Sequence, residues 1–372
     1  MTFVTWDGAG NQPPAFGAAE ELRDRGHDVM FAGYETQRER IAARGFAFAL
    51  LARASAELTR EPPPRPRPAL MMASEQQLAD VSELLVEDPP DVVVVDCLLF
   101  GALAAAEVSN VPSLVFVHSP PSVVLPPGGL LDTFLGPEVA QLRADASLRP
   151  LETLQQAWQG MEAVAVTIPE MDERPSPNVR YVGPIVPRTA HGIWASPWQP
   201  SDDRPLVVVS FTTGGWDQRS RIERTLHGLA DASVRVLVTT AWADVDGLDV
   251  PANAVLAKFV PHAAVMPMAS AVVTHGGHGT VMAAFAHGIP VACLPNALSD
   301  QPAMAERVVQ LGAGISLDGE GASAGQIREA VDQLLRDPSF AASALELAAS
   351  IKASPGAAGM ADVVEYVGPN VP

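Results

Sequence analysis

Four consecutive valines, Val92 to Val95, constrain the fold more than any other stretch of this sequence. They lie between Asp91 and Cys97, and no polar residue alternates with them. A strand with one face in water alternates apolar and polar side chains, whereas an unbroken apolar run is typical of a parallel strand covered on both faces. Residues 111–117 show the same character. These runs predict a parallel sheet between two layers of helices.

Predicted helices separate the predicted strands along the chain. A strand at Phe3–Thr5 precedes a helix from Pro13 to about Arg25, because proline at the first helical position loses no needed donor and Gly26 suits the helix end. A strand follows at Asp28–Ala32. In the second half a helix is predicted at 217–229, and strands at 206–211, 234–240, 271–274 and 291–294. This alternation predicts an α/β protein with doubly wound sheets.

The length of 372 residues suits two domains. The alternation breaks between residues 181 and 205, where prolines and Asp202-Asp203 gather, and this segment is predicted to be the interdomain linker. The expected layout is an N-terminal domain at 1–180, a C-terminal domain at 206–350, and a segment at 351–372 that returns to the first domain. Two Rossmann-like domains in series predict a ligand cleft between them.

Charge limits the partners that this chain can have. The 43 acidic and 24 basic residues give a net charge of −19, which argues against nucleic acid and anionic membranes. No apolar run reaches the ~18 residues that a membrane span needs, and the first residues lack the features of a signal peptide. Cys97 and Cys293 each lie in an apolar stretch, so a reducing cytoplasm is expected. Any anionic ligand must be held by local groups.

The stretch Thr274 to Thr280 joins the predicted strand 271–274 to a predicted helix at 281–287. A glycine-rich turn in that place lets backbone N–H groups and the helix N-terminus bind a phosphate. Thr280 can cap the helix or donate its hydroxyl, and His275 adds a side-chain donor, cationic when protonated. No Asp/Glu cluster stands nearby to hold a divalent metal. The alternative is that the glycines only make a tight turn.

Together with its flanks, this stretch resembles the nucleotide-sugar signature of the bacterial natural-product and macrolide glycosyltransferases, which share a superfamily with the plant and animal UDP-glycosyltransferases. Residues 10–29 also resemble the first βαβ unit of that family. The matching C-terminal segments are Phe259-Val260-Pro261-His262, Thr274 to Thr280, Gly288-Ile289-Pro290, Asp300-Gln301-Pro302 and Leu311-Gly312-Ala313-Gly314. The resemblance implies a GT-B fold, with the donor in the C-terminal half and the acceptor in the N-terminal half.

The resemblance also implies roles for single residues. Phe259 would border or stack on the base, and the Val260 backbone would read the base edge. The diphosphate would be held by His275, Gly277, Gly279 and Thr280, with Thr212 and Thr213 facing the phosphates or the reaction centre. Asp300 and Gln301 would bind the donor sugar, which suits the chemistry because a carboxylate and an amide together accept and donate to hydroxyls. The alternative for Asp300 is the N-terminus of a helix.

The proton acceptor is where the sequence departs from the family. The resemblance places a catalytic histidine after Gly10, and the residue there is Asn11, whose amide is no general base. Three candidates remain: Asp96, which closes the valine strand and matches the family aspartate that partners the missing histidine; Asp7, in the first loop; and His118, which follows the strand 111–117. An acidic, aromatic acceptor would need little help from a base, so the loss of the histidine favours such an acceptor.

Each candidate also has an ordinary structural explanation. Asp7 suits a turn before Gly8, Asp96 suits the cap of the next helix, and His118 suits a loop ahead of Ser119. The acceptor pocket is expected to use apolar side chains of the first domain, for which core packing is the alternative. These side chains are Trp6, Phe100, Phe134, Trp158 and Met161.

The predicted function is therefore an inverting, metal-independent glycosyltransferase. It would move a sugar from a UDP- or dTDP-sugar to a hydrophobic, aromatic natural-product acceptor, with no cofactor beyond the nucleotide sugar. The protein would be a cytoplasmic monomer or homodimer, without nucleic acid or a membrane span. Two alternatives stay open: a sugar-nucleotide epimerase on the same fold, and a nucleotide-sugar-binding protein without catalysis.

Overall fold

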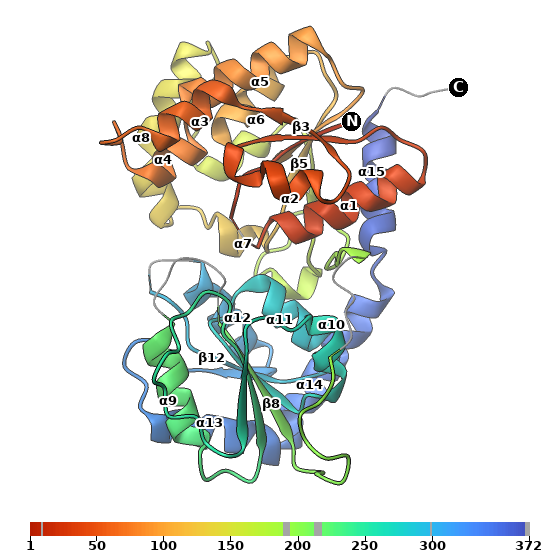
Figure 1. Cartoon of the computed structure of the whole chain (residues 1–372). Coiled ribbons are helices and arrows are strands. Elements are labelled where there is room, and N and C mark those ends of the chain that lie inside the picture. Colours follow the sequence, from red (N-terminus) through yellow and green to blue (C-terminus); the bar gives the residue numbers. More distant parts are fainter. Residues whose placement is uncertain (9, 189–193, 212–217, 298–299, 369–372) are drawn as a thin grey trace. The chain divides into compact units, whose positions relative to one another are not determined.

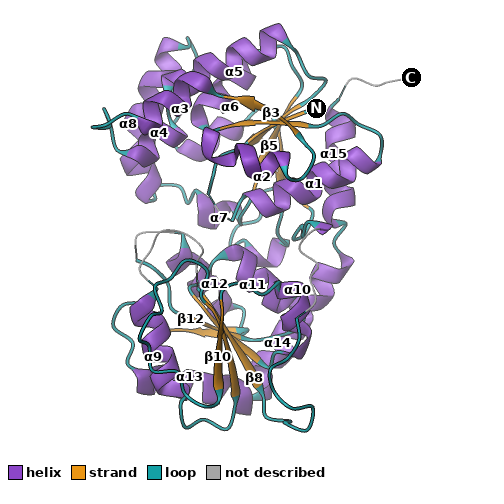
Figure 2. Ribbon diagram, in the orientation of Figure 1, coloured by secondary structure: helices purple, strands orange, loops and turns teal. Residues whose placement is uncertain are grey.

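The protein is described here by a computed structural model that covers residues 1–8, 10–188, 194–211, 218–297 and 300–368. Its contacts divide the chain into two compact units (Figure 1). The first unit contains Met1–Pro187 together with Pro355–Pro372, and the second contains Arg188–Ser354. The boundary after residue 187 falls inside the segment 181–205. Each unit is built around a parallel sheet, with helices on its faces (Figure 2).

The first unit has a seven-stranded sheet among the described residues, in the order β3-β2-β1-β4-β5-β6-β7. Every paired strand runs parallel to its neighbour. The strands are β1 (Thr2–Val4), β2 (Met30–Gly33), β3 (Ala47–Leu50), β4 (Val93–Asp96), β5 (Ser113–Val117), β6 (Glu162–Ala165) and β7 (Val179–Tyr181).

The valines at 92–95 contribute buried side chains to both faces of this sheet. Val93 and Val95 belong to one hydrophobic cluster, while Val92 and Val94 belong to another. Successive side chains of a strand point to opposite faces, so each valine is buried on its own side. The expectation of a parallel strand covered on both faces is confirmed.

Helices cover both clusters of the first unit. Within the chain order, they are α1 (Gln12–Asp24), η1 (Glu35–Gln37), α2 (Arg38–Ala42), α3 (Ala52–Thr59), α4 (Arg67–Met72), α5 (Glu75–Glu87), α6 (Phe100–Val108), α7 (Pro121–Val124), α8 (Leu130–Asp145), η2 (Leu154–Trp158), η3 (Pro169–Met171) and α15 (Gly356–Val367). Helix α15 lies beside α1, although the two come from opposite ends of the chain (Figure 1). Met360 and Val364 of α15 are fully buried in the cluster that also holds Phe16 of α1.

The second unit repeats the plan with a six-stranded parallel sheet among its described residues, in the order β10-β9-β8-β11-β12-β13. Its strands are β8 (Leu206–Ser210), β9 (Arg235–Thr239), β10 (Ala254–Ala257), β11 (Ala271–Thr274), β12 (Val291–Cys293) and β13 (Gly314–Ser316). Its helices are α9 (Arg219–Leu229), α10 (His262–Val265), η5 (Met266–Met268), α11 (His278–Phe285), α12 (Gln301–Gln310), α13 (Ala324–Arg336) and α14 (Pro338–Ala353).

The strand order of each sheet reverses once. In the first unit the reversal falls between β1 and β4, and in the second it falls between β8 and β11. Ligands of doubly wound proteins bind beyond the carboxyl ends of the strands at such a reversal. The loops after β1, β4 and β5 therefore mark the site of the first unit, and the loops after β8 and β11 mark that of the second.

The sequence predicted the fold class and most of the sheet correctly. The predicted strands and the two predicted helices that precede β2 and β9 begin or end within a few residues of the observed ones. The short strands β3, β6, β7, β10 and β13 were not predicted, because three or four residues with mixed burial carry little periodic signal. No helix in the described part of the chain is long and apolar enough to cross a membrane.

Candidate functional site

The glycine-rich turn of the second unit follows the central strand β11 directly. Gly276 has a φ of +83°, which only glycine adopts without strain, and it turns the chain out of the sheet. Gly277 is the N-cap of α11, and its carbonyl accepts the N–H groups of Thr280 and Val281, both at 3.1 Å. The first N–H groups of such a helix have no carbonyl one turn earlier, so they are available to an anion.

His275 is held inside this turn as a neutral imidazole. Its Nδ1 lies 3.3 Å from the Thr274 hydroxyl, and the ring also makes a hydrogen bond with the backbone of Ser210 at the end of β8. Burial, with a smaller contribution from the nearby Arg221, lowers the pKa of His275 to about 4 against the opposing effect of the hydrogen bond with Ser210. In the ligand-free protein His275 therefore offers a hydrogen bond, and not the positive charge that a protonated ring would bring.

Two glycines of the turn face different surroundings. A Cβ atom on Gly277 would come within 2.3 Å of His275 Nε2, so a side chain there would displace the imidazole. A Cβ atom on Gly279 would meet no heavy atom of the described residues within 4 Å. The position of His275 thus requires glycine at 277, while the described residues leave the space over Gly279 open.

The residues expected at the nucleotide base lie on the loop after β10. Phe259 is a large apolar side chain with 73% of its surface exposed, whereas Val260 beside it is buried. Trp242, after β9, is equally exposed, and Lys258 Nζ lies 4.5 Å from the centre of its ring. Trp242 was missed from the sequence because it meets Lys258, the residue before Phe259, only when β9 and β10 pair.

Asp300 and Gln301 stand at the start of α12. Asp300 is the N-cap residue and is exposed, but its side chain makes no capping hydrogen bond to the first turn. Gln301 is buried, and its Oε1 accepts hydrogen bonds from the backbone N–H of Asn296 at 2.9 Å and from Asn296 Nδ2 at 2.8 Å. The amide oxygen of Gln301 thus positions the loop after β12. Thr212 and Thr213, expected near the phosphates, lie outside the described residues.

In the first unit, polar side chains converge on Asp96, which ends β4. The carboxylate is 1% exposed and accepts hydrogen bonds from Trp6 Nε1 and Asn11 Nδ2, both at 3.0 Å. His118 Nδ1, after β5, lies 3.1 Å from Asp96 Oδ2. Strands β1, β4 and β5 are neighbours, so their carboxyl ends bring these residues together.

Burial disfavours the charged form of Asp96, but its hydrogen-bond partners and the nearby His118 stabilise that form more strongly. Burial raises the pKa of Asp96, while the His118 ring and the hydrogen bonds from His118, Asn11 and the Leu98 N–H lower it, and the net shift is downward. Burial lowers the pKa of His118, yet Asp96 raises it well above its ordinary value. The ion pair between Asp96 and His118 contributes to both net shifts.

Asp96, Cys97 and His118 form the group of possible metal ligands found among the described residues, with ligand atoms within 4.8 Å of one another. Cys97 Sγ lies 3.6 Å from His118 Nδ1, the same atom that faces Asp96. A metal would need that nitrogen and a carboxylate oxygen free of protons. The observed contacts are hydrogen bonds that use those atoms, so the donor set suits a hydrogen-bonded cluster.

Asp7, the third candidate base, points to a different partner. Its Oδ1 and Oδ2 lie 3.0 and 3.2 Å from the guanidinium nitrogens of Arg40. Arg40 also donates to Gln12 Oε1 at 2.5 Å. Asp7 is therefore tied to α2 and makes no hydrogen bond to the Asp96 cluster among the contacts of the described residues.

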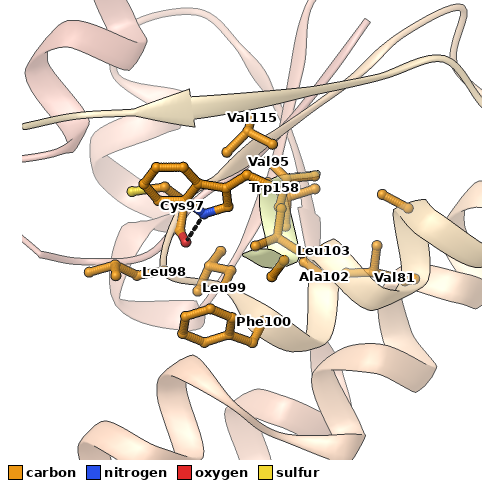
Figure 3. Close-up of a cluster of buried hydrophobic side chains, with 14 of the residues drawn as sticks. Val81, Val95, Cys97, Leu98, Leu99, Phe100, Ala102, Leu103, Val115 and Trp158 are labelled. Carbon is orange, nitrogen blue, oxygen red and sulfur yellow. Dashed lines mark hydrogen bonds between the residues drawn. The ribbon is translucent and has the colours of Figure 1, made fainter. Parts of the chain in front are cut away.

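The expected acceptor residues divide into core and surface. Phe100 and Trp158 are 2% and 5% exposed and lie in the hydrophobic cluster around α6, where Trp158 Nε1 donates to the Cys97 carbonyl at 3.0 Å (Figure 3). These two residues are part of the core, which corrects their assignment to a pocket surface. Phe134 of α8 is 42% exposed, and Met161 is partly buried against the same cluster. Trp6 contacts Asp96, so its indole serves the polar cluster.

Comparison with known proteins shows the family. Residues 223–367 match the family model described as "Erythromycin biosynthesis protein CIII-like, C-terminal domain". The 4'-demethylrebeccamycin synthase of Lentzea aerocolonigenes is 30% identical over 324 residues, which cover 78% of this chain and 76% of that protein. The chain belongs to the natural-product glycosyltransferases.

Two further matches bear on this glycosyltransferase. The UDP-glycosyltransferase 2 of Phaeomoniella chlamydospora is 34% identical over 202 residues, which span 50% of this chain and 44% of the fungal protein. The crystal structure of the glycosyltransferase VinC in complex with DTDP is 21% identical, covers 98% of each chain and has a TM-score of 0.75. The structural likeness shows the GT-B fold of two Rossmann-like domains. None of these matches supports the epimerase or the non-catalytic binding protein.

Proposed function

We propose that this glycosyltransferase moves a sugar from a UDP- or dTDP-sugar to a hydroxyl of a small natural-product acceptor, with inversion at the anomeric carbon. The observation that carries the proposal is the turn Thr274–Thr280 between β11 and α11, with its buried His275 and the open space over Gly279. Backbone N–H groups at a helix N-terminus suit a diphosphate, and they keep suiting it as charge grows on the leaving group.

The remaining donor contacts are proposed around that turn. Phe259 offers an exposed ring to the base, and Asp300 offers an exposed carboxylate to sugar hydroxyls. The names of the matched proteins include both a UDP-glycosyltransferase and a structure holding DTDP. Both nucleotides are therefore kept as donors. The acceptor is proposed to bind the first unit, which holds the Asp96 cluster.

No metal or other cofactor is included in this proposal. Among the described residues, the backbone N–H groups at the start of α11 and the neutral imidazole of His275 can bind a diphosphate by hydrogen bonds. Activity should then persist in the presence of a chelator. A strict requirement for added Mg²⁺ would contradict this part of the proposal.

The test is a transfer assay with UDP-glucose and dTDP-glucose, with and without a panel of phenolic and alcoholic acceptors, in EDTA. Nucleoside diphosphate release that depends on the acceptor, with a glycosylated product in the mass spectrum, is the expected result. The coupling constant of the new anomeric proton distinguishes inversion from retention. Release of nucleotide that is equal with and without every acceptor would reject the transfer reaction.

A further inference from the structure

The carboxylate of Asp96 has no vacant acceptor position. Oδ1 accepts from Trp6 Nε1 at 3.0 Å and from the Leu98 N–H at 3.1 Å, while Oδ2 accepts from Asn11 Nδ2 at 3.0 Å and faces His118 Nδ1 at 3.1 Å. An ionised carboxylate offers about four lone-pair sites, and these contacts use four. Asp96 is also 1% exposed. Its position suits holding other groups in place, and not taking a proton from a substrate.

Asn11 takes part in that support. Its Nδ2 donates to Asp96 Oδ2 at 3.0 Å and to the Trp6 carbonyl at 3.1 Å, while its Oδ1 accepts the Gly8 N–H at 3.2 Å. The residue that replaces the family histidine is therefore a fixed amide that orients Asp96. It holds the first loop against β4 but supplies no base.

His118 is held through one ring nitrogen, which leaves its second nitrogen for the reaction. Its Nδ1 faces Asp96, its ring packs edge-on against Trp6 with the centroids 6.5 Å apart, and 13% of its side chain is exposed. When Nδ1–H donates to the carboxylate, the lone pair of the neutral ring stands on Nε2. Among the described residues, no hydrogen bond is made to Nε2. A histidine oriented through one nitrogen by a buried carboxylate is the arrangement of a general base.

We infer that His118 is the catalytic base of the transfer reaction and that Asp96 and Asn11 are its positioning residues. This inference rests on the proposed function. In the step, the acceptor hydroxyl gives its proton to His118 Nε2, and the freed oxygen lone pair forms a bond to the anomeric carbon. The bond between that carbon and the phosphate oxygen breaks, and its electron pair leaves with the nucleoside diphosphate.

A base formed by His118 and Asp96 would let the enzyme use less acidic acceptors. A chain without a base would be restricted to acidic phenols, which ionise by themselves. The ion pair with Asp96 raises the pKa of His118 against the opposing effect of burial, so the neutral ring is a stronger base than free imidazole. With His118 as the base, we expect aliphatic alcohols to be acceptors as well as the aromatic acceptors that the loss of the family histidine favours.

The pH dependence follows from the groups that face His118. Among the described residues these are Asp96 and Cys97 from the end of β4, and the uncharged ring of Trp6. Burial raises the pKa of Cys97, so the thiol stays protonated and Asp96 is the anion. His118 holds its proton at neutral pH, and kcat/KM for an alcohol acceptor should rise as the pH increases through the raised pKa.

The experiment compares wild-type enzyme, His118→Ala and His118→Gln on substituted phenols of graded acidity and on an aliphatic alcohol. His227→Ala, an exposed residue of α9, is the matched control. We expect kcat with the alcohol to fall about 10²–10⁴-fold in both His118 variants, the range for general-base catalysis, with the donor KM unchanged. The loss should shrink steadily toward 4-nitrophenol, and the alkaline rise of kcat/KM should disappear.

The glutamine variant and added imidazole separate catalysis from folding. Glutamine retains a donor for Asp96, so it provides the test if the alanine variant loses its near-UV spectrum. Free imidazole should restore part of the alcohol rate to His118→Ala. Wild-type rates and an unchanged pH profile in a folded His118 variant would overturn the inference. If the wild-type enzyme transfers sugar to no acceptor, the proposed function itself fails, which is a different result.

Discussion

Gly279 of the phosphate turn shows how one absent side chain can serve a ligand. A Cβ atom there would meet no heavy atom within 4 Å in the part of the chain that the structure describes, and the residue lies in the first turn of α11. No described residue therefore requires a glycine at this position. If a phosphate approaches the backbone here, the reason for the glycine is the ligand.

We expect Gly279→Ala to separate stability from binding. The substitution should stabilise the protein by up to about 1 kcal/mol, because alanine loses less conformational entropy in a helix than glycine. Its methyl group should weaken UDP or dTDP binding by about 10–100-fold, the equivalent of one lost hydrogen bond to a charged group. Urea unfolding and isothermal titration calorimetry measure the two effects.

Gly325→Ala is the control for this substitution. Gly325 occupies the same second position in α13 and is exposed. Among the described residues, its Cβ atom would meet only Ser323 Oγ, at 3.9 Å. It should show the stability gain with wild-type affinity. Equal affinities of the two variants would place the diphosphate elsewhere.

The neutral state of His275 gives a second prediction for this site. Its pKa is lowered from 6.5 to about 4, so the unfolded chain binds a proton at a higher pH than the native protein does. The stabilising effect is present above pH 6.5 and is lost as the pH falls toward 4, by about 3 kcal/mol in total. His275→Gln should remove this part of the pH dependence. The measurement is the free energy of unfolding at pH 7 and pH 4.5; an identical pH dependence in both proteins would contradict the buried neutral ring.

Among the secondary-structure elements, α15 has the most distant partner in sequence. Arg25, which follows α1, donates to Asp362 Oδ1 at 2.7 Å, to Glu365 Oε2 at 2.9 Å and to the Ala358 carbonyl at 3.0 Å. His27 Nε2 lies 2.9 Å from Glu365 Oε1. Hydrogen bonds from one guanidinium to several points on α15 fix the position of that helix along α1, while the buried Met360 and Val364 supply the apolar contact.

Arg25→Met should destabilise the first unit by about 1–2 kcal/mol, since it removes several charge-assisted hydrogen bonds of a side chain that is mostly buried. Arg38→Met is the control, because Arg38 makes an exposed pair with Glu35 three residues earlier. It should leave the unfolding midpoint in urea nearly unchanged. If both variants unfold at the wild-type midpoint, the docking of α15 depends on its apolar face alone.

For the whole molecule, charge opposes the proposed donor. The chain carries a net charge of −19, and a nucleotide sugar is also an anion. Raising the salt concentration screens their long-range repulsion, while hydrogen bonds inside the turn are screened much less. The KM for the donor should therefore decrease as the NaCl concentration is raised from about 10 to about 150 mM, which shortens the Debye length from about 30 to about 8 Å.

The KM of an uncharged acceptor, measured in the same series, is the control and should stay constant. A donor KM that rises with salt would show that local cations dominate the approach of the nucleotide. That result would direct attention to Lys258, which lies at the exposed Trp242 beside the proposed base site.

The sequence by itself determined the parallel strands, the two α/β units and the glycine-rich turn, because each depends on residues adjacent in the chain. Four valines in a row are buried on both faces wherever the strand lies, and a turn between strand and helix needs its glycines locally. The family resemblance rests on the same local segments. These features were sufficient to predict a GT-B glycosyltransferase.

Only the tertiary structure decided which side chains surround Asp96. Trp6 lies 90 residues away in sequence and His118 lies 22 residues away, and they meet because β1, β4 and β5 are adjacent in the sheet. Strand order and burial also occupy the acceptor positions of Asp96, while in the described part of the chain no hydrogen bond is made to His118 Nε2. Those properties depend on neighbours across the sheet, which residue spacing does not specify.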